Sequence, residues 1–179
     1  MKFQYLISVI ALAVCANHAA AKAVVVNQAI TEQDVLAAQQ GWCKALVDIS
    51  ATHEKEGQAA AKALAEKVID AAYGYQLGAV LFKPTLTVNP QTFRTTREGA
   101  LSYFVGGNPS FAQDTGFALK GWKKCEVDNA AIFIAGDSAS TMGKDGKITS
   151  VDKTWGYVKD KAGALRIVVH HSSLEYQGK

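Results

Sequence analysis

The chain has 179 residues, of which 49% are hydrophobic and 20% are charged, and its formal net charge is +3. This balance is typical of a globular protein and excludes an intrinsically disordered tail. No cluster of lysines and arginines accompanies the small positive charge, so we expect no nucleic-acid partner. The length fits a single folded domain.

The N-terminal segment has the features of a secretory signal peptide. A positive start at Met1-Lys2 is followed by an apolar run over 5–14 and by the small residues Ala19-Ala20-Ala21. The apolar run is too short to span a bilayer, which takes about 20 residues. We therefore predict a signal peptide over 1–21, one domain over 22–179, a periplasmic or secreted protein, and no membrane partner after cleavage.

The first part of this domain has helical patterns. Thr31 is a candidate helix cap, and apolar residues recur at helical spacing from Val35 to Ile49, which predicts a helix to about His53. Gly57 interrupts the pattern, and Gly74 and Gly78 end the second helix. The predicted apolar stripe of that second helix consists of Ala60, Leu64, Val68 and Ala72.

The second part is rich in β-branched and aromatic residues and predicts strands. A strand is expected over 79–88, a short extended piece over 91–94, and a short helix from Thr96 through Phe104. A β-meander follows, with strands expected at 117–122, 130–135, 138–142, 151–159 and 165–173, and with turns at Gly136-Asp137 and Asp145-Gly146. Helices followed by antiparallel strands indicate an α+β fold, in which helices packed into a curved sheet form a cone with an internal pocket.

Metal-ligating patterns are sparse in residues 22–179. A zinc site usually takes three or four ligands, and the histidines available are His53, His170 and His171. His53 has no second histidine at ligand spacing, and His170 and His171 are neighbours on a strand, so they point to opposite faces. The sequence predicts no metal site, unless ligands gather only in three dimensions. Cys43 and Cys125 either form a disulfide or are two separate buried side chains, and both interpretations stay open.

A polar cluster at the end of the last strand is the strongest candidate for chemistry. His171 and Ser173 share one face of this strand, whereas His170 and Ser172 share the other. One of the two faces lines the pocket, unless the strand simply runs out into solvent. Thr85 either contributes a further hydroxyl to the pocket or is present only because threonine favours strands.

Several motifs, taken together, resemble a known family. They are Phe82-Lys83-Pro84-Thr85, Phe93-Arg94, Leu101-Ser102-Tyr103-Phe104-Val105-Gly106-Gly107, Asp114-Thr115-Gly116-Phe117-Ala118, Val151-Asp152-Lys153-Thr154-Trp155-Gly156-Tyr157 and His170-His171-Ser172-Ser173-Leu174. In this order they resemble the iota-class carbonic anhydrases, a group similar to the association domain of calcium/calmodulin-dependent protein kinase II within the NTF2-like (SnoaL-like) superfamily. The resemblance covers residues 35–176, and Glu175 stands where the family usually has proline.

The resemblance implies reversible hydration of carbon dioxide to bicarbonate by a homodimer with an NTF2-like, cone-shaped αβ barrel. It also implies a metal-free site, with zinc or manganese as the alternative, in which hydroxyls of Thr85, Tyr103 and Ser173 hold bicarbonate. His171 is our candidate base or proton relay, because it shares the face of Ser173 and imidazole titrates near neutrality. Ser172 and His170 are further candidate bicarbonate contacts. A non-enzymatic NTF2-like domain for small-molecule binding or oligomerisation is the alternative function.

Overall fold

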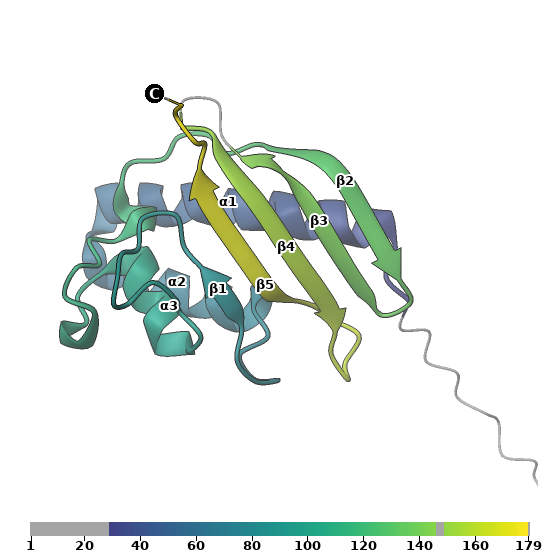
Figure 1. Ribbon diagram of the computed structural model, residues 1–179. Coiled ribbons are helices and arrows are strands. Elements are labelled where there is room, and N and C mark those ends of the chain that lie inside the picture. Colours follow the sequence, from purple (N-terminus) through teal and green to yellow (C-terminus); the bar gives the residue numbers. More distant parts are fainter. Residues whose placement is uncertain (1–28, 146–148, 179) are drawn as a thin grey trace, which may run out of the picture.

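The computed structural model describes residues 29–145 and 149–178 (Figure 1), so the predicted signal peptide lies outside the described residues. No helix in this part of the chain combines the length and apolar character that a membrane crossing needs. The helices are α1 (Glu32–Glu56), α2 (Gln58–Ala72) and α3 (Arg97–Val105), with 3-10 turns at Pro109–Phe111 and Phe117–Leu119. The strands are β1 (Leu81–Lys83), β2 (Val127–Ala135), β3 (Ser138–Asp145), β4 (Val151–Lys159) and β5 (Leu165–Leu174).

Helix α1 begins where the sequence predicts. The Thr31 hydroxyl accepts a hydrogen bond from the backbone N–H of Asp34, and the Asp34 carboxylate accepts one from the backbone N–H of Thr31. The helix continues past the expected end to Glu56, and Gly57, with φ at 83°, separates it from α2. In α2 the fully buried stripe is Ala61, Ala65 and Ile69, one position along from the predicted stripe.

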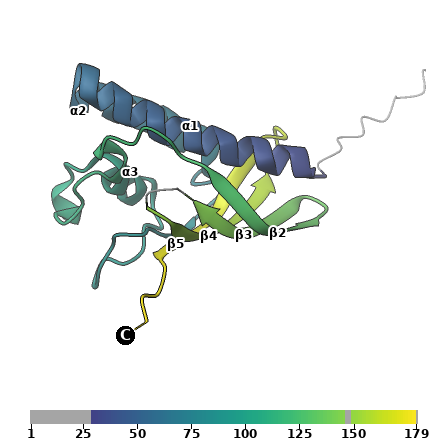
Figure 2. The same cartoon turned by 90° about the horizontal axis from the view of Figure 1, so that it is seen from above.

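The strands form one sheet in the order β1-β5-β4-β3-β2. β1 runs parallel to β5, and the other neighbouring pairs are antiparallel. The sheet is open, because β1 and β2 are its two edges. Figure 2 shows α1 lying across one face of the sheet, so the helices and the curved sheet together enclose the interior. This arrangement confirms the predicted α+β class, and helices rather than further strands complete the wall of the cone.

β2 and β3 are each three residues longer than predicted, and two other predicted strands differ more strongly. Only Leu81–Lys83 of the segment 79–88 is a strand, because Pro84 has no N–H to continue the ladder. The expected strand over 117–122 is instead a 3-10 turn that follows Gly116 at φ 83°. There the Trp122 indole N–H donates to the Phe117 carbonyl at 2.7 Å and folds the segment back on itself. The expected extended piece over 91–94 belongs to no strand.

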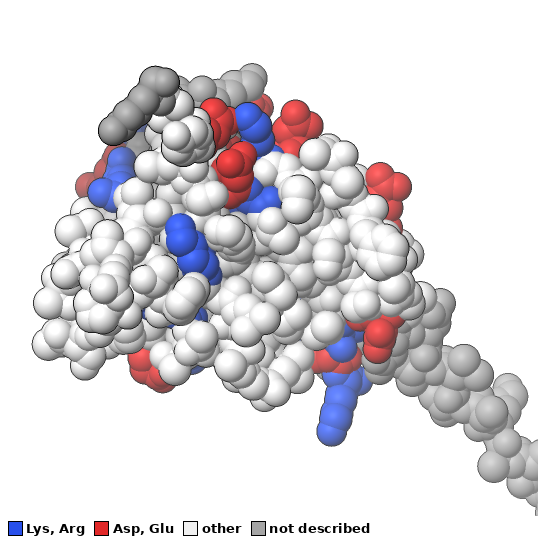
Figure 3. Space-filling view, viewed as in Figure 1, with Lys and Arg blue, Asp and Glu red and all other residues white. Residues whose placement is uncertain are grey.

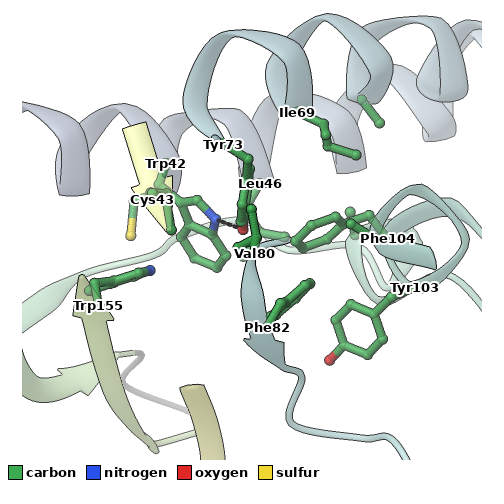
Figure 4. Close-up of a cluster of buried hydrophobic side chains, with 14 of the residues drawn as sticks. Trp42, Cys43, Leu46, Ile69, Tyr73, Val80, Phe82, Tyr103, Phe104 and Trp155 are labelled. Carbon is green, nitrogen blue, oxygen red and sulfur yellow. Dashed lines mark hydrogen bonds between the residues drawn. The ribbon is translucent and has the colours of Figure 1, made fainter. Parts of the chain in front are cut away.

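The core lies between the helices and the inner face of the sheet. Figure 4 shows aromatic side chains from α1, β1, α3 and β4 packed together, among them Trp42, Phe82, Phe104 and Trp155. A disulfide between Cys43 and Cys125, with a Cα–Cα distance of 5.1 Å, ties α1 to the segment before β2. This bond settles the alternative that the sequence left open.

Candidate functional site

A small polar cavity lies inside the apolar core. Its polar wall consists of Thr85, Tyr103, Lys153, His170 and Ser172. Its apolar wall consists of Trp42, Phe82, Pro84, Phe104 and Phe117. The cavity volume is about 10 Å³, which is about the smallest space that can hold one water molecule. A polar cluster surrounded by aromatic rings is typical of a small-molecule site.

The structure places the predicted residues of β5 on two different faces. Ser172 pairs with Lys153 of β4, and His170 pairs with Trp155, so these side chains share the inner face. His170 and Ser172 are accordingly buried, whereas His171 is exposed and Ser173 is half-buried on the outer face. The structure therefore brings His170 and Ser172 to the cavity with Thr85 and Tyr103, and it leaves His171 and Ser173 on the other face of β5. Alternate side chains of a strand share a face, so Ser172, two residues from His170, points into the cavity with it.

Two hydroxyls of the cavity are paired with each other. The Thr85 Oγ1 and Ser172 Oγ atoms lie 2.6 Å apart, which joins the loop after β1 to the end of β5. One of the two hydroxyls donates to the other, so the pair keeps one proton free to donate elsewhere. The contact depends on β1 pairing in parallel with β5, where Lys83 lies beside His171.

Tyr103 supplies a third hydroxyl. Its side chain extends from α3, and its hydroxyl is buried without a protein hydrogen-bond partner among the described residues. Burial raises the pKa of Tyr103, and weaker interactions with the backbone of Leu86 and with the hydroxyl and backbone of Thr85 only partly oppose this effect. The phenol therefore stays neutral near pH 7 and acts as a hydrogen-bond donor. In Figure 4 its oxygen points away from Phe104 and the helical layer.

The cavity also contains a buried lysine that the sequence analysis missed. The Lys153 Nζ lies 3.0 Å from His170 Nε2 and 3.4 Å from a carboxylate oxygen of Asp145. It also sits 3.9 Å from the centre of the Trp42 ring. The signal was present in the sequence, since Lys153 occupies an inward position in the alternating pattern of β4.

His170 is held rigidly by its neighbours. Its Nδ1 lies 2.8 Å from the Tyr73 hydroxyl, which accepts a hydrogen bond of 3.0 Å from the Trp42 indole N–H (Figure 4). Its ring stacks on Phe82 with centroids 4.5 Å apart. Burial, followed by the charge of Lys153, lowers the pKa of His170 well below its usual range. The imidazole is therefore neutral, and both of its nitrogens are engaged.

No residues in the described part of the chain form a convincing metal centre. One group there, Cys43, Cys125 and Asp145, brings potential ligand atoms close together. The two sulfur atoms are bonded to each other and are not thiolates, the form in which cysteine binds metals. The described residues therefore do not fit the zinc or manganese alternative.

Comparisons with known proteins agree with this architecture. A family model described as metal-independent carbonic anhydrase matches residues 33–174. A metal-independent carbonic anhydrase from Nostoc sp. strain PCC 7120 is 61% identical over 162 residues, which cover 87% of this chain and 79% of that protein. The crystal structure of an iota-carbonic anhydrase from a cyanobacterium, complexed with bicarbonate, is 60% identical with a TM-score of 0.84, over 88% of this chain and 99% of that one.

More distant structures have a weaker likeness. An NTF2-like protein of unknown function from Methylobacillus flagellatus KT is 11% identical, with a TM-score of 0.43 over 82% of this chain and 96% of that one. The family match and the 61% identical relative, each covering most of the chain, are sufficient. The chain belongs to the metal-independent carbonic anhydrase family.

Proposed function

We propose that this protein catalyses the reversible hydration of carbon dioxide to bicarbonate in the cavity between α3, β4 and β5. The observation that carries the proposal is the convergence of Thr85, Tyr103 and Ser172 on one buried space beside apolar rings. Membership of the family supports it, as does the likeness to a structure described as complexed with bicarbonate. A non-enzymatic binding domain would use the same cavity, but the family match does not favour it.

The reaction requires an attacking oxygen, an acceptor for its proton, and donors for the charge that develops on carbon dioxide. The neutral Tyr103 phenol and the free proton of the Thr85–Ser172 pair are suitable donors. They also fix the orientation of the reacting oxygens, which lowers the entropic part of the barrier. Phe82 and Phe117 provide an apolar surface that suits uncharged carbon dioxide. Binding of a three-atom substrate requires the side chains to open the cavity beyond the volume of one water.

The two neighbouring serines of β5 give a sharp test of this site. Ser172→Ala removes a cavity hydroxyl, whereas Ser173→Ala makes the same chemical change on the outer face. We expect carbon dioxide hydration, followed by stopped-flow with a pH indicator, to fall about 10-fold or more in Ser172→Ala. The Ser173→Ala variant should differ much less from the unmodified protein. The opposite order of effects would place the reaction on the outer face and reject the proposed cavity.

We propose further that the protein is a homodimer that associates through the outer face of its sheet. Strand pairing aligns a row across that face, formed by Phe133, Ser140, Gly156, Val169 and Leu81. Phe133 and Met142 are 71% and 62% exposed, and Figure 3 shows that this face is largely uncharged. Analytical ultracentrifugation should give a dimer for the unmodified protein and a monomer for Phe133→Lys. A monomeric unmodified protein would reject the association.

We also propose that the protein works outside the cytoplasm, in the periplasm or as a secreted protein. The signal-like segment over 1–21 supports this location. The Cys43–Cys125 disulfide is independent support, because such bonds persist mainly in oxidising compartments. Expression of the full chain in a bacterium, followed by fractionation and N-terminal sequencing, tests it. Cleavage after Ala21 is the expected result, and an intact N-terminus in the cytoplasmic fraction would contradict the proposal.

A further inference from the structure

The proposed reaction needs a proton acceptor, and the hydroxyls of the cavity do not provide one. Attack of water on carbon dioxide releases a proton, and a neutral phenol or alcohol is too weak a base to take it near pH 7. Lys153 lies opposite Ser172 in the register of β4 and β5, and its side chain lines the same cavity. It is only 4% exposed, so its nitrogen faces protein groups rather than solvent.

Other titratable groups near the cavity are less suitable. His170 is neutral with a strongly lowered pKa, and both of its nitrogens have partners. His171 lies on the exposed outer face. Burial raises the pKa of Tyr103, so its phenolate form is rare. Asp145 does not line this cavity and lies behind Lys153, at 3.4 Å from its nitrogen.

The surroundings of Lys153 allow its side chain to switch between the neutral amine and the charged ammonium. Among the described residues, Asp145 faces it from β3 and His170 from β5, while α1 presents the uncharged ring of Trp42. Burial lowers the pKa of Lys153 to about 8, and the Asp145 carboxylate opposes a larger change. Both the amine and the ammonium are therefore accessible near neutral pH.

His170 holds the lysine nitrogen in either protonation state. The Tyr73 oxygen accepts a hydrogen bond from Trp42 and can accept a second one from His170 Nδ1–H. With its proton on Nδ1, the neutral imidazole presents a lone pair at Nε2 to Lys153. An ammonium and an amine both have an N–H to donate to that lone pair. In the amine form the nitrogen lone pair is then left free for a proton from the cavity.

We propose that the Lys153 amine, positioned by His170, is the base that accepts the proton of the attacking water. The inference rests on the proposed function and deepens it. As the water oxygen bonds to carbon, one C=O electron pair moves onto its oxygen, and an O–H bond of the water breaks with its proton passing to Nζ. The products are bicarbonate and the Lys153 ammonium, which Asp145 stabilises. The ammonium then loses its proton to buffer, and the reverse reaction uses the same steps in the opposite order.

The test measures the rate of carbon dioxide hydration against pH for four variants and the unmodified protein. Lys153→Met removes the amine, Asp145→Asn removes the opposing carboxylate, and the double variant removes both charges so that no buried charge remains unpaired. Lys44→Met is the matched control, because the Lys44 side chain is 75% exposed and pairs with Asp48 on α1. Circular dichroism and thermal unfolding establish that each variant is folded.

For the unmodified protein, hydration should rise with pH around a midpoint near the Lys153 pKa of about 8, because the amine is the active form. Lys153→Met and the double variant should lose about 10²-fold to 10⁴-fold in kcat and lose this rise. Asp145→Asn should move the midpoint to lower pH, since removal of a negative charge destabilises the ammonium. A purely structural role for Lys153 would not produce this shift. Lys44→Met should keep the profile of the unmodified protein.

The outcomes separate the two claims. If the unmodified protein is active and the folded Lys153→Met or double variant keeps its full rate and pH profile, the role of Lys153 is overturned. The proposed function then still stands. An unmodified protein that does not accelerate hydration at any pH overturns the proposed function, and this inference falls with it. An unchanged midpoint in Asp145→Asn also contradicts the assignment of the profile to Lys153.

Discussion

Replacement of Tyr103 by phenylalanine separates function from stability. The Tyr103 hydroxyl is buried and has no protein hydrogen-bond partner among the described residues. Its ring packs on Phe117 with centroids 5.4 Å apart and against Phe82 at 5.7 Å, and the substitution leaves both contacts in place. No protein hydrogen bond of good geometry is lost, so the free energy of unfolding should fall by less than about 0.5 kcal/mol or should rise. Hydration should nevertheless slow by about 10²-fold, the usual cost of one lost transition-state donor.

The matched control is Tyr73→Phe. The Tyr73 hydroxyl contacts Trp42 Nε1 at 3.0 Å and His170 Nδ1 at 2.8 Å, and all three side chains are buried. Its loss leaves two buried polar atoms without this partner, each at a cost of about 1–3 kcal/mol. We therefore expect Tyr73→Phe to lower the free energy of unfolding by about 2–4 kcal/mol, in clear contrast to Tyr103→Phe.

Urea unfolding followed by tryptophan fluorescence measures both stabilities, and stopped-flow hydration measures both activities. We expect Tyr103→Phe to be folded, at least nearly as stable as the unmodified protein, and catalytically poor. A Tyr103→Phe variant that loses 2 kcal/mol or more would show that its hydroxyl has a structural partner. A stable variant with full activity would remove Tyr103 from the reaction.

Three further predictions concern other parts of the structure. Replacement of Cys43 and Cys125 by serine should lower the free energy of unfolding by about 4 kcal/mol, since the disulfide closes a loop with a sequence separation of 82 residues. Urea unfolding of both proteins checks this, and equal unfolding midpoints would contradict it. Asp114→Ala should lower the free energy of unfolding by about 3–5 kcal/mol in the same assay, because it removes the carboxylate that lies 2.6 Å from the buried Arg94 guanidinium. A loss below about 1 kcal/mol would contradict the burial of that ion pair. Thr85→Val should reduce hydration about 10-fold or more while keeping the fold, and unchanged stopped-flow rates would exclude its hydroxyl from the site.

Local patterns predicted the helical part of the fold well. The cap at Thr31 and the break at Gly57 depend on neighbours in the chain, so they could be identified from the sequence. The 3-10 turn at Phe117–Leu119 could not, because its apolar and aromatic residues Phe117, Leu119 and Trp122 resemble a strand. Its conformation depends on packing against Tyr103 of α3 and on the Trp122 side chain, which are tertiary contacts.

For the site, the sequence predicted a polar cluster on the last strand but not which face of that strand is buried. Alternation separates His170 and Ser172 from His171 and Ser173, yet only the pairing with β4 shows which set is buried. Lys153 was overlooked because lysine is usually exposed, and its burial depends on partners from two other strands. The nearness of Thr85 to Ser172 likewise depends on the parallel pairing of β1 with β5.

The central claim is that hydroxyls of the chain, together with a buried base, hydrate carbon dioxide in the cavity. Its most direct test is stopped-flow hydration by the purified protein after treatment with a chelator and measurement of its metal content. We expect a rate well above that of the buffer, undiminished by the chelator and not increased by added zinc or manganese. A protein that does not accelerate hydration, or whose activity disappears with the chelator and returns with the metal, would contradict it.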